Sequence, residues 1–199
     1  MELSPLAKEK LAKIGELTKD EKERLKLSNE LTALLADYFT NKINADALWS
    51  KLKTQKESGN DLIIRETQMR LIGALNLGSK DIDFKRNRKG ILACETLKDQ
   101  NRYPEIELVL NSVAALRKQY LKEKDATFNS MKASVQKQVE MAARQVAKQT
   151  GNKDVSIDIK GSVEASVLSS PQWAEFVLKN DTIYGQKFAD YITKLKSLI

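Results

Sequence analysis

No glycine or proline interrupts the chain from Glu105 to Thr150. Apolar residues recur in this stretch at spacings of three and four, the period of a helix that buries one side and of a coiled-coil seam. A continuous helix here would extend for about 65 Å at the helical rise per residue. Such a rod would protrude from a compact domain of 199 residues, so this stretch constrains the fold strongly. Its first apolar positions are Ile106, Val109, Val113, Leu116 and Tyr120.

The apolar spacing changes near Lys124 and then continues to residue 146. Two successive steps of four resemble a stutter in a coiled coil, which one long helix tolerates. In the alternative interpretation, the sequence KDATFNS breaks the helix, and Asp125 or Thr127 caps a second one. The pattern therefore predicts either one long helix or a helical hairpin over residues 104–149.

The remaining sequence also favours helices, because the chain contains only three prolines and eight glycines and is rich in good helix formers. We expect an all-α protein, a multi-helix bundle of about seven or eight helices. With 41% hydrophobic residues, the chain is long enough to bury one sizeable core as a single domain, residues 1–199. The alternative division is an N-terminal helical group, residues 1–78, and a C-terminal group, residues 84–199.

Capping signals locate several of these helices. Thr18 and Glu21 have the spacing of a capping box and predict a helix over residues 19–40. Asn44 is predicted to cap a short helix that ends near Gly59. Ser4 and Pro5 suggest a weaker helix before residue 18, and Ser170 with Pro171 begins a short helix that another follows. Two further helices are predicted over residues 61–78, apolar on most sides and closed by Gly78, and over residues 84–99.

In one region the spacing of the apolar residues changes from the helical period to a period of two. Apolar residues alternate over residues 155–159 and again over residues 163–167, with Lys160, Gly161 and Ser162 between them. Alternation is typical of strands, so we expect a small β-hairpin near residues 155–167. The competing interpretation is a helical turn over residues 162–169 that begins at Ser162.

The residue types exclude large classes of chemistry. The chain has no histidine, which removes histidine-based catalytic triads, histidine-ligated zinc sites and histidine proton shuttles. The single cysteine, Cys94, cannot form a cysteine-rich metal site, and no glycine-rich phosphate-binding loop is present. We expect a protein that is not an enzyme and that has no metal and no cofactor.

Two acids and the cysteine are the remaining candidates for catalysis. Glu66 and Glu95 lie within or beside apolar helical stretches, where burial would raise the pKa of a carboxyl group. Structural ion pairs perturb acids in the same way, so an acid-catalysing enzyme is a minor alternative. Cys94 has only Lys98 one turn away as a cationic neighbour and is interpreted as a small core residue.

A basic cluster is the candidate nucleic-acid site. Four cations lie within five positions at the predicted start of a helix, where a phosphate group could bind. Asp81 and Asp83 partly neutralise them, and no aromatic residues alternate with them to stack on bases. A second basic group, Arg117 with Lys118, Lys122 and Lys124, would extend the cluster if the two helices were neighbours. The cluster consists of Lys85, Arg86, Arg88 and Lys89.

Together these features predict a non-enzymatic helical protein that acts by contact with a protein partner or by self-association, for example as a homodimer. The contact would use residues 104–149 or the C-terminal seam. An RNA- or DNA-binding helical module is the alternative, consistent with a net charge of +7. That C-terminal seam contains Tyr184, Phe188, Tyr191, Leu195 and Leu198.

The location of the protein is predicted from what its sequence lacks. The first twenty residues are too densely charged for a secretory signal, and no apolar run reaches the length that a membrane span needs. A single cysteine fits a reducing compartment. We therefore expect a soluble, cytoplasmic protein.

Overall fold

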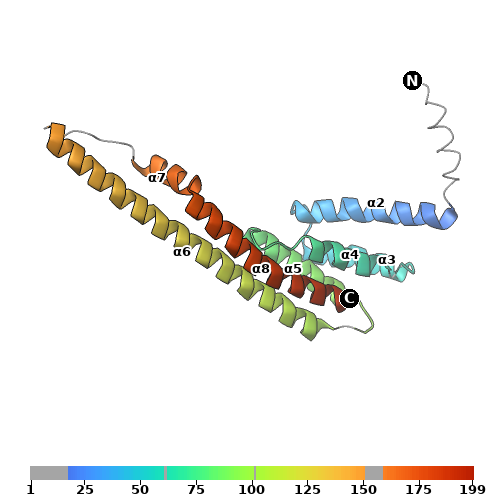
Figure 1. Ribbon diagram of the computed structural model, residues 1–199. Coiled ribbons are helices and arrows are strands. Elements are labelled where there is room, and N and C mark those ends of the chain that lie inside the picture. Colours follow the sequence, from blue (N-terminus) through green and yellow to red (C-terminus); the bar gives the residue numbers. More distant parts are fainter. Residues whose placement is uncertain (1–17, 61, 101, 151–158) are drawn as a thin grey trace, which may run out of the picture. The chain divides into compact units, whose positions relative to one another are not determined.

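A computed structural model describes residues 18–60, 62–100, 102–150 and 159–199. These ranges contain seven α-helices and no strand (Figure 1), so the prediction of an all-α protein is confirmed. The helix predicted before residue 18 lies outside the described ranges. The helices are α2 (Lys19–Phe39), α3 (Ala45–Glu57), α4 (Leu62–Gly73), α5 (Asp81–Glu95), α6 (Tyr103–Thr150), α7 (Ile159–Leu168) and α8 (Pro171–Ser197).

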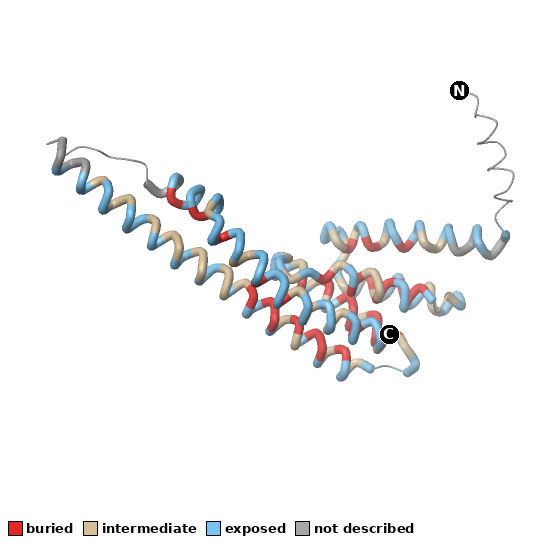
Figure 2. The backbone as a smooth tube through the Cα atoms, viewed as in Figure 1, coloured by how far each residue is buried: buried red, intermediate tan, exposed pale blue. Residues whose placement is uncertain are grey.

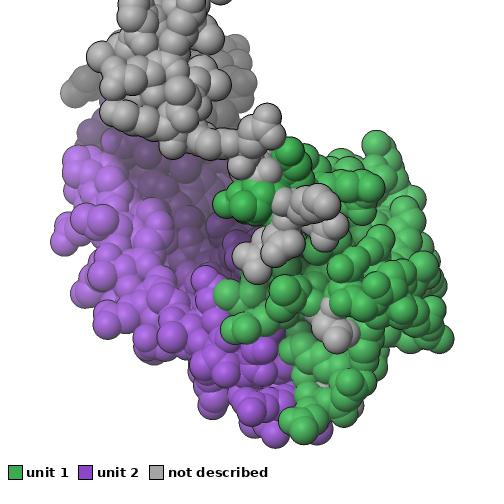
Figure 3. Space-filling model, turned by 90° about the vertical axis from the view of Figure 1, so that its right-hand side faces the viewer, with its two compact units in different colours: residues 1–71, 89–101 green, residues 72–88, 102–199 purple. Residues whose placement is uncertain are grey.

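The chain divides into two compact units, coloured separately in Figure 3. Unit 1 comprises residues 1–71 and 89–101, and unit 2 comprises residues 72–88 and 102–199. The boundaries fall inside α4 and α5. The first part of α4 and the last part of α5 therefore belong to unit 1.

Side-chain caps determine where the helices of unit 1 begin. The Thr18 hydroxyl accepts a hydrogen bond from the Glu21 backbone N–H at 3.2 Å, and the Glu21 carboxylate accepts one from the Thr18 N–H at 2.8 Å. This pair confirms the predicted capping box of α2. Asn44 caps α3 by accepting from the Ala47 N–H at 2.9 Å, and Gly59 follows α3 with a φ of 86°.

The core of unit 1 is built from apolar faces of four helices. α4 supplies Ile63, Ile64 and Leu71 to this core, but its opposite face is exposed. The expectation that α4 is buried on most sides is therefore correct for only one side of the helix. Besides these residues of α4, the buried apolar side chains of unit 1 are Leu31, Leu35, Tyr38, Leu48, Leu52, Ile91, Leu92, Cys94 and Leu97.

Gly90 is the point of closest approach between α5 and its neighbours in unit 1. A Cβ atom at this position would lie 2.9 Å from both Leu71 Cδ1 and the Tyr38 hydroxyl oxygen. Both of those side chains are almost completely buried. They cannot move aside without disturbing the core, so the packing here requires glycine.

α4 ends at Gly73, five residues before the predicted end at Gly78. We attribute the early end of α4 to tertiary hydrogen bonds within unit 2. Arg117 of α6 is buried and donates to the backbone oxygens of Asn76, at 3.0 Å, and Ser79. These bonds hold the backbone of residues 76–79 in its non-helical conformation. Asn87 adds a third bond of this kind, to the Ala74 oxygen at 3.2 Å.

Arg117 makes two more contacts in unit 2. Its guanidinium group lies 4.4 Å from the centre of the Phe84 ring and 3.5 Å from Asp81. Its side chain is only 3% exposed. A buried cation is tolerated at this position because backbone oxygens, a carboxylate and a ring face all surround it.

Residues 103–150 form the single helix α6, so the first of the two predicted alternatives is correct. α7 and α8 pack against α6, and α8 runs antiparallel to it (Figure 1). The buried residues of α6 all lie between Ile106 and Tyr120 among the described positions, and its later part is only partly covered (Figure 2). Neither α6 nor any other described helix is long and apolar enough to cross a membrane.

The apolar seams predicted for α6 and α8 pack against each other. Tyr120 and Tyr184 meet edge to face with ring centres 5.6 Å apart, and Phe128 meets Trp173 at 5.2 Å. The two helices predicted after Ser170 are one continuous helix, because this single seam runs along its whole length. The residues around the two tyrosines are Leu77, Leu116, Leu121, Phe188 and Tyr191.

Polar groups complete the contact between α6 and α8. The Tyr120 hydroxyl donates to Asp181 at 2.8 Å, and the Tyr184 hydroxyl bonds to Glu123. Burial raises the pKa of Tyr184 to about 12, and the nearby carboxylate of Glu123 adds to the rise. The same hydrogen bond lowers the pKa of Glu123. Both tyrosines therefore bury their rings while their hydroxyl groups remain paired.

The predicted β-hairpin is wrong for residues 159–167, which belong to α7. Residues 155–158 lie outside the described ranges. Val163 and Val167 are both buried, and a spacing of four places them on one side of a helix. Their burial against neighbouring helices outweighs the alternating pattern, because tertiary packing overrides local preference. The competing interpretation, a helical turn over residues 162–169, is correct in type, but α7 begins at Ile159 and not at Ser162.

Substitution of Gly90 tests the close approach in unit 1. Gly90→Ala is expected to lower the free energy of unfolding by about 1–3 kcal/mol, because the added methyl group overpacks the core. The control is Gly185→Ala in α8, where a Cβ would meet no atom within 4 Å. That change is expected to raise stability by about 0.5–1 kcal/mol, since alanine favours helix. Urea unfolding followed by circular dichroism measures both, and equal effects would contradict the close approach.

Substitution of Arg117 tests the cause of the early end of α4. Arg117→Met keeps most of the packing volume but removes the donors, so a loss of about 3 kcal/mol is expected. Lys118→Met is the matched control, because Lys118 is the exposed neighbour in the same helix and should change stability by at most about 0.5 kcal/mol. Thermal unfolding compares the two variants. Similar melting temperatures for both would show that Arg117 does not hold the segment after α4.

Candidate functional site

The basic cluster predicted from the sequence lies on α5, and the structure separates its members into two kinds. Arg86 is paired with Asp83 at 2.8 Å, and Arg88 with Glu107 at 3.1 Å. Lys85 and Lys89 are exposed. Two of the four charges are thus already balanced within the chain, and the two lysines remain accessible to an anion.

The second basic group does not form the exposed face that was predicted with Arg117, because Arg117 points into unit 2 and is buried. Lys124 donates to the Tyr120 hydroxyl at 3.1 Å. Lys118 and Lys122 are exposed. The prediction of one positive face that includes Arg117 is therefore wrong, because backbone oxygens and the Phe84 ring hold its guanidinium group inside the unit.

The two candidate acids lie on different helices, Glu66 on α4 and Glu95 at the end of α5, and do not come together. Glu66 is on the exposed face, with a side chain 54% exposed, and pairs with Arg70 at 2.8 Å. Glu95 is completely buried, accepts from Gln68 Nε2 at 2.8 Å and pairs with Lys98 at 2.9 Å. The described residues contain no group of three or more acids and cysteines arranged to hold a metal ion.

Cys94 is buried, which confirms its interpretation as a core residue. Burial raises the pKa of its thiol to about 12, although the positive charge of Lys98 opposes the rise. The reactive form of cysteine is the thiolate. A thiol with such a high pKa remains protonated at neutral pH and is a poor nucleophile.

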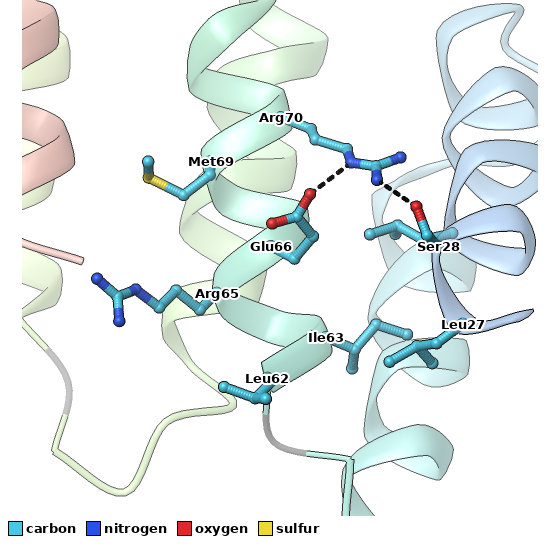
Figure 4. Close-up of a pocket in the computed structure, with 9 residues that line it drawn as sticks. Leu27, Ser28, Leu62, Ile63, Arg65, Glu66, Met69 and Arg70 are labelled. Carbon is cyan, nitrogen blue, oxygen red and sulfur yellow. Dashed lines mark hydrogen bonds and ion pairs between the residues drawn. The ribbon is translucent and has the colours of Figure 1, made fainter. Parts of the chain in front are cut away.

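A groove in unit 1 contains one of the candidate acids, Glu66. It lies between α2 and α4 and has a volume of about 530 Å³. Figure 4 shows α4 with α2 beside it, and Leu27 and Ile63 facing each other across the groove. The groove is lined by Leu27, Ser28, Leu31, Leu62, Ile63, Arg65, Glu66, Met69 and Arg70.

The groove has an apolar floor and an exposed apolar edge. Leu31 and Ile63 form the floor and are almost completely buried. Leu62 stands at the start of α4 and is 68% exposed, while Leu27 and Met69 are partly exposed. Exposed leucines are common, but an exposed leucine beside an apolar hollow is typical of a contact surface.

The polar side of the groove is held in place by Arg70. Its guanidinium group donates to Glu66 Oε1 at 2.8 Å, to Ser28 Oγ at 3.0 Å and to Thr32 Oγ1 at 2.8 Å. The bonds to Ser28 and Thr32 connect α4 to α2, and Figure 4 draws the bond to Ser28. Because three partners orient its guanidinium group, the Arg70 side chain is fixed in position across the groove.

Arg65 differs from Arg70. It is exposed and makes no side-chain hydrogen bond or ion pair within the ranges that the structure describes. It projects from the edge of α4 that carries Met69, away from α2 (Figure 4). The groove therefore presents one cation that a binding partner can pair.

A second hollow of unit 1, of about 400 Å³, contains Trp49 and three charged side chains. Its polar groups already have partners. Trp49 Nε1 donates to Thr96 at 3.0 Å, and Lys56 pairs with Asp99 at 2.6 Å. This hollow consequently offers a ligand fewer unpaired groups than the groove does.

The groove was missed in the sequence because α4 was interpreted as a buried helix. One signal for it was present. Leu62, Arg65, Glu66 and Met69 are spaced by three and four, so they share one face of a helix. Two adjacent charges on that face indicate that it meets solvent or a partner.

Of the two seams that were predicted to mediate self-association, the C-terminal seam and the α6 seam up to Tyr120 have buried residues inside unit 2. Ile106, Val113 and Leu195 are completely buried, and Tyr184 is nearly so. These side chains pack within the chain, as described above for α6 and α8.

Comparison with known proteins gives one match. No curated protein and no solved structure matches the chain. A family model matches residues 49–197, which is about three quarters of the chain and extends from within α3 to the end of α8. The matched range includes the α4 side of the groove and leaves α2 outside it. On the strength of this match, the chain belongs to DUF6657, a family of unknown function.

Proposed function

We propose that this protein is a non-enzymatic helical protein that acts by binding a protein partner through the groove of unit 1. The observation that carries the proposal is the combination of an apolar floor, an exposed leucine edge and the exposed cation Arg65, which has no partner among the described residues. Protein interfaces combine an apolar centre with a polar rim, and arginine is enriched in them. The groove has both parts.

The state of the candidate catalytic groups supports a role in contact over a role in chemistry. The chain has no histidine. Its cysteine is buried, Glu66 is paired with Arg70, and Glu95 is enclosed by Gln68 and Lys98. A general acid or base must reach a substrate, but Cys94 and Glu95 are buried and the Glu66 carboxylate is held by Arg70.

The apolar seams of α6 and α8 pack against each other inside unit 2, which supports the choice of the groove as the contact surface. Apolar side chains that pack within a chain are not available to another protein unless the packing opens. In unit 1, the two large apolar side chains that are strongly exposed among the described residues are Leu25 and Leu62. They lie on α2 and α4, the two helices that form the groove.

The proposal predicts binding that depends on the groove. Three tagged proteins are immobilised: the wild-type chain, the variant Leu62→Glu and a control variant, Leu178→Glu. Each is exposed to lysate of the native cell and to an untagged copy of the chain. Leu178 is 71% exposed on α8 of unit 2, so the control makes the same change outside the groove. At least one protein identified by mass spectrometry should bind the wild type and the control, and should be reduced about tenfold on Leu62→Glu. If no bound protein distinguishes the two variants, the proposal is wrong.

A second candidate function is binding of RNA or DNA, which the distribution of charge favours. Unit 2 contains 19 of the 34 basic residues and 13 of the 27 acidic residues, so almost all of the net charge of +7 belongs to it. Phosphate contacts dominate the affinity of proteins for nucleic acids. Lys85 of unit 2 is an accessible member of the predicted cluster, and the other accessible member, Lys89, belongs to the part of α5 in unit 1.

This second candidate predicts salt-dependent binding of a labelled 30-nucleotide RNA and of a duplex DNA. Replacing Lys85 and Lys89 together by Ser should weaken binding and reduce the slope of log affinity against log salt by about 1.5–2, because two phosphate contacts are lost. Replacing Lys194 and Lys196 by Ser removes the same charge at the end of α8 and is the control. Fluorescence anisotropy measures each slope. Equal slopes for the two double variants would exclude a specific role for the cluster.

A further inference from the structure

We infer that the segment before α2, residues 1–17, is an internal occupant of the groove of unit 1, which a protein partner must displace in order to bind. This inference rests on the proposed function, because it adds a regulation to the same contact surface. These residues, called the pre-α2 segment, lie outside the described ranges, and their part in the contact is inferred from their sequence.

The sequence of the pre-α2 segment predicts a short helix with an apolar side. Ser4 and Pro5 are a favourable cap and a favourable first-turn residue. A helix shorter than about 12–15 residues is marginal in water, so its stability depends on packing its apolar side against another surface. The segment therefore needs such a surface. Its apolar positions are Leu3, Leu6, Leu11, Ile14 and Leu17.

Unit 1 presents uncovered apolar side chains on the two helices that form the groove. Leu25 on α2 is 53% exposed, and Leu62 on α4 is 68% exposed. The groove floor, formed by Leu31 and Ile63, is apolar as well. A single contact between the segment and the groove would remove apolar surface of both from water, which is favourable.

The backbone at Thr18 turns the chain away from the axis of α2. Thr18 is the N-cap residue, with φ −58° and ψ 162°, so a helix before it cannot continue straight into α2. Gly15 favours the end of a helix and leaves residues 15–17 as a short loop. Two helices joined by such a loop pack antiparallel. This geometry directs the segment back along α2, towards the groove.

The lengths of the two helices fit this arrangement. Leu27 follows Thr18 by nine residues, which is about 14 Å along α2 at the helical rise. In an antiparallel hairpin that turns at residues 15–17, Leu6 lies about 12–14 Å from the turn, at the level of Leu27. Ile63 faces Leu27 across the groove (Figure 4), so Leu6 would enter the groove between them.

Charge complementarity favours the same arrangement. Arg65 is exposed at the rim of the groove, two residues after Ile63, and has no side-chain partner within the described ranges. Glu9 follows Leu6 by three residues, so the two share one side of the predicted helix. Insertion of Leu6 beside Ile63 would therefore bring the Glu9 carboxylate to the rim, where Arg65 can pair with it.

Disulfide trapping in the full-length chain tests the contact. Ala7, next to Leu6, is replaced by Cys in three double variants, each with a second cysteine at the groove: Leu62→Cys, Arg65→Cys or Met69→Cys. At about 1 µM protein, cross-links form within one chain, because the tethered segment has a much higher effective concentration than a second chain. Mass spectrometry measures the rate. At least one groove pair should form a disulfide about tenfold faster than the control pair.

The control pair is Ala7→Cys with Asn29→Cys. Asn29 is exposed on α2 and lies between Leu27 and Leu31 in the sequence. It is two residues from Leu31, so it lies on the opposite side of the helix from the groove floor. Cys94 can remain in every variant, because burial raises the pKa of its thiol to about 12 and a protonated thiol does not exchange.

Substitutions in the segment test which side of it meets the groove. In the fastest groove pair, Leu6→Glu should slow the cross-link about tenfold, because the charge cannot enter the apolar groove. Lys8→Glu places the same side chain on the opposite side of the predicted helix and should change the rate less than about twofold. The inference is wrong if no groove pair is faster than the control pair, or if these two substitutions act alike.

Charge exchange tests the position of Glu9. In the pair that uses Leu62→Cys or Met69→Cys, Arg65→Glu should slow the cross-link, because two carboxylates then meet at the rim. Adding Glu9→Arg should restore most of the rate, since opposite charges meet again. A rate that stays low after the second change would contradict the pairing of Glu9 with Arg65.

The regulation and the proposed function are distinguished by adding Leu6→Glu to the immobilised chain. A protein whose capture depends on Leu62 should then bind about threefold or more tightly, because the groove is no longer occupied. Unchanged capture would show that the segment does not compete. If such a protein binds but no groove pair cross-links, only the internal occupant is wrong. If a groove pair cross-links but no protein depends on Leu62, the segment covers the groove and the proposed function is wrong.

Discussion

The apolar stripe on the first five turns of α6 is the interaction on which unit 2 depends. It buries Ile106, Leu110 and Val113 completely, and the seam of α8 packs along the same helix. The stripe also carries Arg117, whose side chain holds the backbone of the segment after α4. One helix face thus supplies both the apolar core and the polar bonds that shape the neighbouring segment.

Capping residues in the sequence predicted three helix starts correctly, whereas the helix predicted over residues 84–99 is α5, which begins at Asp81 and ends at Glu95. The caps at Thr18, Asn44 and Ser170 depend on residues within four positions of each other, so the sequence contains the whole cause. The end of α4 could not be predicted in this way. It depends on Arg117, about forty residues away, and on Asn87. The helix over residues 159–168 depends in the same manner on the burial of Val163 and Val167.

The candidate functional residues likewise divide into those whose pairing has a local cause and those whose pairing depends on distant parts of the chain. The pairing of Arg86 with Asp83 follows from their spacing of three on a helix and could have been predicted. The pairing of Arg88 with Glu107 joins two helices and could not. The groove also escaped prediction, because it needs α2 and α4 to lie beside each other. Only the charges on the exposed face of α4 indicated that this face was unlike the face that builds the core.

The uneven burial along α6 has a consequence for how the helix opens. Packing protects its backbone amides between Ile106 and Tyr120, where side chains on one face are enclosed. Beyond Tyr120 no described side chain of α6 is buried, so opening the backbone there breaks fewer tertiary contacts. Local unfolding in a protein begins where such contacts are fewest. We therefore expect the late half of α6 to exchange its amide protons faster than the early half, although both belong to one continuous helix.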